Sequence, residues 1–285
     1  MAEKTKKSGA KPDLATIGGI VIALVCIVGG LMIEGGKIKD IAQLTAAMIV
    51  LGGTLGAVMV STPLPVLKGA AKRFTGVLMD ATAPHDELIE ELIGYATKAR
   101  KQGLVGLEQE ALEIEDPFLN KALNLAVDGT DLQEIRKMLE LEIDLREHHT
   151  DAEARVFESA GGYAPTIGII GAVLGLIQVM KNLANIEEVG RGIAVAFVAT
   201  IYGVAIANLF LLPVAAKIKA RAKMESQRLE LILEGVCGIV EGLNPKLIRQ
   251  KLDAFSHGPP KSKKTPAPAA AAGAEAGGSP AEVNA

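Results

Sequence analysis

The sequence has no tryptophan, and aromatic residues make up only 3% of its 285 residues. The formal net charge is −3, so the chain lacks the basic surface that a nucleic-acid-binding protein needs. Its two cysteines, Cys26 and Cys237, have no metal-ligand or redox spacing. A disulfide scaffold is therefore excluded, and we expect both cysteines to be small buried apolar residues.

Enzyme motifs are also missing. The chain has no P-loop, no HExxH, no nucleophile elbow and no Gly-rich dinucleotide fingerprint. The one paired imidazole feature, His148-His149, lies in a charged stretch without a cysteine or a third ligand, so we interpret it as solvated. We therefore expect no enzymatic activity, no metal site and no cofactor.

What the chain has in excess is apolar residues, which reach 49% with a mean hydropathy of +0.31. Four runs at 14–33, 41–67, 159–180 and 192–216 contain no Asp, Glu, Lys, Arg or His. A helix needs about 20 apolar residues to cross roughly 30 Å of hydrocarbon. Each run is long enough, so we predict transmembrane helices over 14–33, 41–61, 159–180 and 192–216.

Basic residues near the ends of these helices predict the orientation. Eleven Lys and Arg follow the second and fourth runs or precede the first, whereas the two short loops hold four. Both termini and the large loop are therefore expected in the cytoplasm. The first run is expected to stay as an uncleaved anchor, because no small-residue cleavage site follows it. The predicted parts are a cytoplasmic N-terminus (1–13), a membrane hairpin (14–67), a cytoplasmic helical domain (68–158), a second membrane hairpin (159–216), cytoplasmic C-terminal helices (217–257) and a disordered Ala/Pro-rich tail (258–285).

The polar segments show helical periodicity and no strand pattern. Leu88, Leu92, Ala96 and Ala99 recur at helical spacing before a Gly103 stop. We predict helices over 84–102, 104–113, 117–127 and 130–158, the last continuing into the third membrane helix, and a C-terminal helical stretch over 224–255 with a break at Asn244-Pro245. The fold class is therefore expected to be all-α, with four transmembrane helices.

Small residues recur every three or four positions on the third and fourth runs. They include Gly168, Gly171 and Gly175 on the third run and Gly203 on the fourth. In lipid such stripes let helix backbones approach closely. The spacing leaves two interpretations open: the stripes pack the four helices of one chain, or they face other copies or a partner helix.

No ionisable group stands at membrane depth, where such groups are costly and usually functional. The chain therefore either moves no ions or relies on a partner for the carboxylate. Thr200, the one aliphatic hydroxyl of the fourth run, either bonds its own helix backbone or lines an ion path. Pro165 and Pro213 are tolerated in membrane helices as kinks or helix starts.

Several blocks carry a family resemblance. They are IVLGGTLGA in the second run, YAPTIGIIGAVLGLIQVMKNL (Tyr163 to Leu183), GIAVAFVATIYGVAIANLFLLP (Gly192 to Pro213), DPFLNKALNLAVDG in the polar domain and GLNPKLIRQKL after the fourth run. Over about residues 14–255 the chain resembles the MotA/PomA family of flagellar stator proteins.

The resemblance implies a pentameric ring in the bacterial inner membrane, around two copies of a single-pass MotB/PomB partner. The partner's intramembrane Asp accepts the ion, and the cytoplasmic domain turns the rotor by contacting FliG. The family's rotor-facing Arg and Glu fall on Arg100 and Glu108, and its ion-path Thr falls on Thr200. Its two prolines, which couple ion flow to movement, fall on Pro165 and Pro213.

The resemblance also bears on the ion and on the ring. Sodium-driven members carry a Thr seven residues after the proline of the third helix, where this chain has Ala172. Because Na⁺ needs oxygen ligands, we expect coupling to protons. We assign Gly168, Gly171, Gly175 and Gly203 to ring packing.

Three alternatives compete with a stator. The TolQ/ExbB family also forms rings around a single-pass partner, but its members are usually shorter and have three membrane helices. A self-sufficient channel or transporter is disfavoured by the lack of ionisable groups in the four runs. A passive membrane scaffold would use Arg100 and Thr200 only for stability.

Overall fold

The computed structural model describes residues 11–77, 79–80 and 85–257. The predicted disordered tail and most of the predicted N-terminal segment lie outside the described residues. Within the described part, strands are confined to one antiparallel pair, in which Lys11–Pro12 (β1) lies beside Met79–Asp80 (β2). The all-α fold class is confirmed, and the β1–β2 pair is an addition that no residue pattern predicted.

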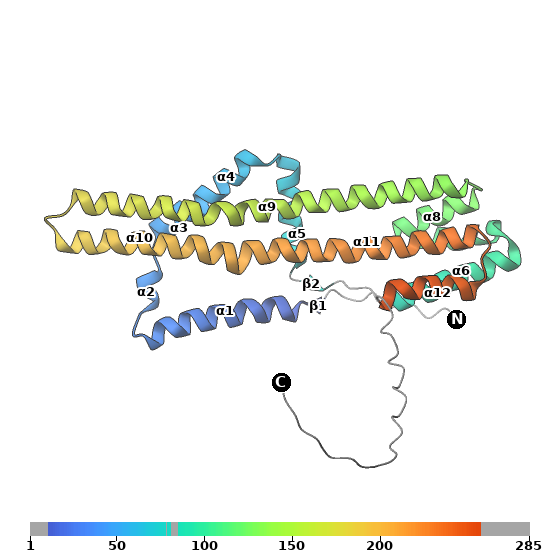
Figure 1. The fold of residues 1–285 in the computed structure, drawn as a ribbon, viewed down its shortest axis with the longest axis horizontal. Helices are drawn as coiled ribbons and strands as arrows, with labels where there is room; N and C mark the ends of the chain where they lie inside the picture. The colour runs from blue at the N-terminus through green and yellow to red at the C-terminus, as the bar shows by residue number, and fades with distance from the viewer. Residues whose placement is uncertain (1–10, 78, 81–84, 258–285) are drawn as a thin grey trace, which may run out of the picture.

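Two long helical rods run side by side along the molecule (Figure 1). The first is α9 (Leu132–Lys181), which Asp131 caps by accepting a hydrogen bond from the amide of Gln133. The second consists of α10 (Ile186–Ile206), a π-helical turn (Ala207–Leu211) and α11 (Leu212–Val240). The predicted continuation of the polar helix into the third membrane helix is therefore correct.

The second rod is longer than the sequence predicted. The predicted fourth membrane helix (192–216) and the first part of the predicted C-terminal helices (217–257) are one continuous rod, which extends through α11 to Val240. It ends where Gly242 adopts a left-handed φ of 68°, a conformation that glycine adopts at little cost. The Asn244 side chain then accepts a hydrogen bond from the amide of Lys246 and begins α12 (Pro245–His257).

The first two membrane helices differ from each other in packing. Helix α1 (Leu14–Ile33) is capped by Asp13 and buries none of its residues in this chain. Exposed Cys26 lies on it, so the expected burial of this cysteine is wrong, whereas Cys237 in α11 is buried. The second helix follows the short α2 (Ile38–Ile41) and packs against the rods. Its pieces are α3 (Leu44–Ala47), a π-helical turn (Met48–Gly52) and α4 (Gly53–Ser61).

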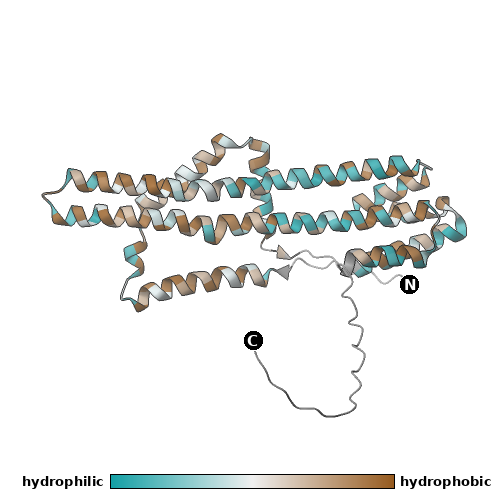
Figure 2. Cartoon of the chain, in the orientation of Figure 1, coloured by the Kyte–Doolittle hydropathy of each residue, from teal (hydrophilic) through white to brown (hydrophobic). Residues whose placement is uncertain are grey.

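Four helices are long and apolar enough to cross a membrane, in agreement with the prediction. Figure 2 shows that hydrophobic residues gather in one half of the molecule and hydrophilic residues in the other. Both rods cross this boundary, so the rods join the membrane half to the polar half. A twist or tilt of the rods in the membrane would therefore reach the polar domain directly.

The polar half is a helical domain around one core. Its elements are α6 (His85–Gln102), a 3₁₀ turn (Leu104–Leu107), α7 (Glu108–Glu113), α8 (Pro117–Val127), the polar ends of α9 and α11, and α12. Helix α5 (Leu64–Val77) lies outside this core and packs against α9 and α11. Leu92, Phe118, Leu139, Ile232 and Leu252 are among the fully buried side chains of this core. They come from five different helices, so the core fixes α6, α7 and α8 onto the ends of the rods.

Candidate functional site

Arg100 and Glu108, the predicted rotor-facing residues, stand on either side of a tight connection. Arg100 lies in the last turn of α6 and Glu108 in the first turn of α7, where their charges suit the helix dipoles. Both side chains are exposed and neither makes an ion pair or hydrogen bond with a residue that the structure describes. Both charges are therefore available to a partner.

The connection between these two residues is compact. Gly103 ends α6 with a left-handed φ of 79°. A Cβ at Gly106 would lie 2.7 Å from the Cβ of Gln102, so only glycine lets the 3₁₀ turn pack this closely on α6. An ion pair between Lys98 and Glu110 then joins α6 to α7, and the hydrogen bond from Lys98 holds the pKa of Glu110 below its ordinary value.

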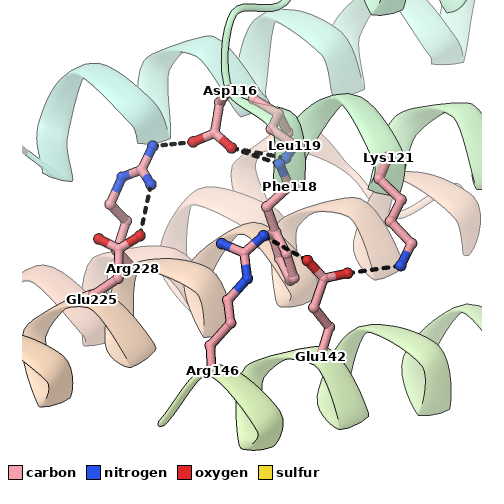
Figure 3. A network of polar contacts seen from close by, with 8 residues as sticks. All are labelled: Asp116, Phe118, Leu119, Lys121, Glu142, Arg146, Glu225 and Arg228. Atoms are coloured by element: carbon pink, nitrogen blue, oxygen red, sulfur yellow. Dashed lines mark hydrogen bonds and ion pairs between the residues drawn. The ribbon is translucent and has the colours of Figure 1, made fainter. Parts of the chain in front are cut away.

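Helix α8 is anchored at its start by Asp116, which α11 holds in place (Figure 3). The Asp116 carboxylate accepts hydrogen bonds from the amides of Phe118 (2.8 Å) and Leu119 (3.2 Å) and pairs with Arg228 of α11. Burial raises the pKa of Asp116, but the hydrogen bonds from Arg228 and the two amides outweigh it, so the pKa lies below its ordinary value.

A second group of contacts in Figure 3 anchors α8 to α9. Glu142 of α9 accepts hydrogen bonds from Lys121 (2.7 Å) and Arg146 (2.6 Å), and the guanidinium of Arg146 lies 5.5 Å from the centre of the Phe118 ring. Burial raises the pKa of Glu142, but the hydrogen bonds from the two cations outweigh it, so the pKa lies below its ordinary value. Both rods thus fix α8, the helix against which α7 packs.

The four glycines assigned to ring packing lie inside a single chain, between α9 and α10. A Cβ at Gly168 would lie 2.9 Å from the Ala199 carbonyl oxygen. At Gly171 it would meet the Ala199 Cβ at 2.8 Å, and at Gly175 the Gly192 carbonyl oxygen at 2.8 Å.

Gly203 faces α9 just as closely, because a Cβ there would lie 2.5 Å from the Ala164 carbonyl oxygen. All four glycines are buried. Packing of the helices within one chain, one of the two interpretations that the spacing left open, is therefore what the structure shows, and the assignment to ring packing stays a prediction. Helical spacing could not separate the two, because it gives the same stripe for either neighbour.

The ion-path candidates lie on the same hairpin. Thr200 is half-buried, and its hydroxyl donates to the carbonyl oxygen of Ala196, 3.1 Å away on its own helix. Ala172 on α9 is half-buried and contributes no side-chain oxygen. Thr166, the residue after Pro165, is exposed and donates to the Tyr163 carbonyl oxygen. The hydroxyls of Thr200 and Thr166 therefore both donate their protons to backbone carbonyls.

The two prolines occupy different settings. Pro165 lies inside α9, where Gly203 of α10 packs against it: a Cβ at Gly203 would lie 3.1 Å from the Pro165 Cα. Pro213 is the second residue of α11, directly after the π-helical turn. Its ring would clash with the carbonyl of Leu209 in a regular α-helix, and the wider π turn that contains Leu209 relieves this clash.

Two polar connections at the membrane half were not predicted. The Tyr202 hydroxyl of α10 donates to the Ile41 carbonyl oxygen (2.5 Å) and accepts from the Gln43 amide (3.3 Å). These bonds replace helical ones where the backbone leaves the helix at 42–43, so the second membrane helix begins at Leu44 rather than 41. Tyr202 is the only tyrosine of the fourth run, and its polar hydroxyl in an apolar run was the sequence signal that could have pointed to this connection.

The other connection joins the start of α1 to α11. Asp13 pairs with Lys217 and with Arg221 (3.0 Å), and the hydrogen bond from Lys217 lowers the pKa of Asp13 to about 2. Because α1 buries no residue in this chain, it is held chiefly at its ends, by this cluster and the β1–β2 pair at its start and by the short loop before α2.

Comparison with known proteins identifies the family. Residues 17–103 match the model of the motility protein A N-terminal region, and residues 110–231 match that of the MotA/TolQ/ExbB proton channel family. Motility protein A of Bacillus subtilis (strain 168) is 34% identical over 241 residues, which cover 84% of this chain and 89% of that protein.

Solved structures point to the same family. The structure of C. jejuni MotAB matches with a TM-score of 0.83 and 35% identity, covering 87% of this chain and 98% of that one. The flagellar MotAB stator complex from Bacillus subtilis matches with a TM-score of 0.79 and 34% identity, covering 85% and 95%. The chain therefore belongs to the MotA/TolQ/ExbB proton channel family, in the branch of the MotA/PomA stator proteins of the flagellar motor.

Proposed function

We propose that this chain is the ring-forming subunit of a flagellar stator. With a single-pass MotB/PomB-type partner it forms an ion-conducting complex that converts ion-motive force into rotation of the flagellar rotor. One observation carries the proposal: the chain belongs to this family, yet its four apolar runs contain no ionisable side chain. Ion passage needs a group that binds the ion at membrane depth, so the partner supplies the carboxylate.

The assembly follows from the resemblance. Five copies form a ring around two copies of the partner in the bacterial inner membrane, and both termini and the polar domain face the cytoplasm. The excess of Lys and Arg on that side supports this orientation. The chain itself carries out no covalent chemistry and holds no cofactor. The alternative, a TolQ/ExbB-type energy-transducing subunit, shares the ring but has no rotor to turn.

The coupling ion is H⁺. Ala172 contributes no oxygen, and the Thr200 hydroxyl already donates to its own helix, so the hairpin offers few ligands to Na⁺. A proton needs only the partner's carboxylate and water. The rods bend at Pro165 and Pro213 as the ion passes. Pro165 lies where Gly203 packs closely against α9, and Pro213 follows the wider π-helical turn.

Torque passes to FliG through Arg100 and Glu108. Rim charges of this kind give fast, reversible and specific contacts. The test is the double charge reversal Arg100→Glu with Glu108→Lys, measured as stall torque of single motors. We expect torque to fall severalfold while membrane insertion and ring mass stay unchanged.

A matched control is available in the same domain. Arg249 and Glu90 are also exposed but pair with each other at 2.5 and 2.7 Å, so the swap Arg249→Glu with Glu90→Arg keeps their pair and should leave torque unchanged. Equal torque in the wild type and in the Arg100/Glu108 variant would refute the rotor assignment.

A further inference from the structure

Two apolar side chains are exposed on the short segment that carries Glu108. Val105 has 69% and Leu112 has 78% of its surface exposed. Leu107 and Ala111, which lie between them in sequence, are fully buried in the core of the domain. The segment therefore has an inner face held by the core and an outer face that is open.

Glu108 lies on this outer face together with the two apolar residues. Val105, Glu108 and Leu112 are three and four positions apart, the spacing that places side chains on one side of a helix. Leu107 and Ala111, also four apart, define the opposite, buried side. The outer face thus presents a carboxylate between two apolar side chains.

This face is remote from the membrane. The connection between α6 and α8 lies at the end of the molecule opposite the turn that joins α9 to α10 (Figure 1), and in the hydrophilic half (Figure 2). Lipid therefore does not cover Val105 and Leu112. A single exposed apolar residue needs no explanation, but two that flank an accessible carboxylate match the mixed surface of a protein contact.

We propose that Val105, Glu108 and Leu112 form a docking face for a helix of the rotor protein that presents a Lys or Arg between apolar side chains. The inference rests on the proposed function, because it refines the contact made there by Glu108. The apolar flanks exclude water from the ion pair, and this strengthens the pair by lowering the local dielectric. They also add an attraction that salt does not screen.

The occupant is the rotor rather than a neighbouring copy of this chain. A copy seated on Val105 and Leu112 would also cover Glu108, since the three side chains share one face. Glu108 has no partner among the described residues of its own chain, and the proposed rotor contact needs its carboxylate accessible. A rotor helix with a cation at the matching position satisfies the charge and the apolar groups together.

The test uses the complete stator complex and the variant Val105→Thr with Leu112→Gln. Threonine has nearly the shape of valine, and glutamine has a helix propensity similar to that of leucine, so the segment keeps its fold. Affinity for purified FliG is measured at several salt concentrations, together with stall torque. Leu141→Gln is the matched control, because Leu141 is 59% exposed on α9 and lies outside this face.

We expect the Val105/Leu112 variant to bind FliG about tenfold more weakly, as loss of partly covered apolar area predicts, with a matching loss of torque. Its binding should depend more steeply on salt, because water and ions then reach the ion pair. The Arg100/Glu108 charge reversal should instead invert the salt dependence, because salt then screens a repulsion rather than an attraction. Leu141→Gln should bind as the wild type does.

Wild-type affinity in the Val105/Leu112 variant would overturn the proposal. A change in its ring mass would also overturn it, because the face would then be an interface between copies. If the Arg100/Glu108 variant also bound FliG normally, or if the wild type did not bind, the proposed function itself would have failed.

Discussion

Lys98 and Glu110 form an ion pair that joins α6 to α7. Lys98 lies two residues before Arg100 on α6, and Glu110 lies two residues after Glu108 on α7. Each side chain of the pair is 31% exposed. The pair therefore fixes how the two free charges are presented, while the free charges themselves stay in solvent. A motor contact needs this combination, since mobile charges on a mobile segment would transmit little force.

Breaking this ion pair should reduce torque without unfolding the domain. Glu110→Gln removes the charge and should cost about 1 kcal/mol of stability, as expected for a half-exposed pair. Stall torque should fall, and the swap Lys98→Glu with Glu110→Lys should recover most of it. Lys98→Glu alone is the complementary measurement. Normal torque in both single variants would show that the pair plays no part in presenting Arg100 and Glu108.

Gly203→Ala should destabilise the membrane hairpin. The new Cβ would lie 2.5 Å from the Ala164 carbonyl oxygen, and backbone cannot move aside as a flexible side chain can. Overpacking of this kind costs about 1–3 kcal/mol, seen as a lower Tm of the complex in detergent. Gly190→Ala is the control, because nothing lies within 4 Å of its Cβ position. An unchanged Tm for Gly203→Ala would contradict the close approach of α9 and α10.

Tyr202→Phe should loosen the attachment of the first hairpin to the second. The change removes the hydrogen bonds to Ile41 and Gln43, and leaves two backbone groups without partners at a cost of about 1–3 kcal/mol. Tyr163→Phe serves as the comparison, since the Tyr163 hydroxyl bonds no residue that the structure describes. A Tm loss of equal size in both variants would argue against the role given to Tyr202.

The polar domain should lose stability in acid. Asp116 and Glu142 have folded pKa values below their ordinary values of 3.8 and 4.5. The unfolded chain therefore binds more protons than the folded chain in acid. The stability that these two carboxylates contribute is fully present when the pH lies above their ordinary pKa values. It is lost as the pH falls through their folded pKa values. Arg228→Gln should lower the free energy of unfolding at pH 7 and flatten this acid dependence. A parallel acid profile in wild type and variant would contradict the Asp116–Arg228 account.

Motor speed should follow the proton gradient. With Ala172 in the sodium-ligand position, replacing Na⁺ by K⁺ at fixed pH should leave speed unchanged, and acidifying the outside should raise it. Ala172→Thr should not create sodium dependence by itself, because one oxygen does not complete a Na⁺ site. Speed that falls with Na⁺ removal in the wild type would refute proton coupling.

The sequence predicted those elements whose signals are local. Leu88, Leu92 and Ala96 are buried in α6 as their spacing required, and Pro117 begins α8 as expected. Charge-free runs are equally local, because each helix must satisfy its own backbone in lipid. Such patterns depend on a residue and its neighbours three or four positions away, so one sequence suffices to find them.

What the sequence could not give depends on residues far apart in the chain. Asp116 meets Arg228, and Tyr202 meets Gln43, only after the rods have paired. No helical or strand periodicity in the sequence relates positions so far apart. The glycine stripes are ambiguous for a related reason: Gly168 on α9 and Gly203 on α10 show the same spacing whichever surface they meet, and within this chain each meets the other helix. The Arg100/Glu108 assignment came from family resemblance, and the structure adds that both are exposed.

The intact mass of the complex, purified in mild detergent with its single-pass partner co-expressed, tests the central claim most directly. The account predicts a ring of five copies that retains two copies of the partner, the source of the missing membrane carboxylate. A chain that purifies as a monomer, or as a ring that never retains a partner, would contradict it, since no group would then bind the ion.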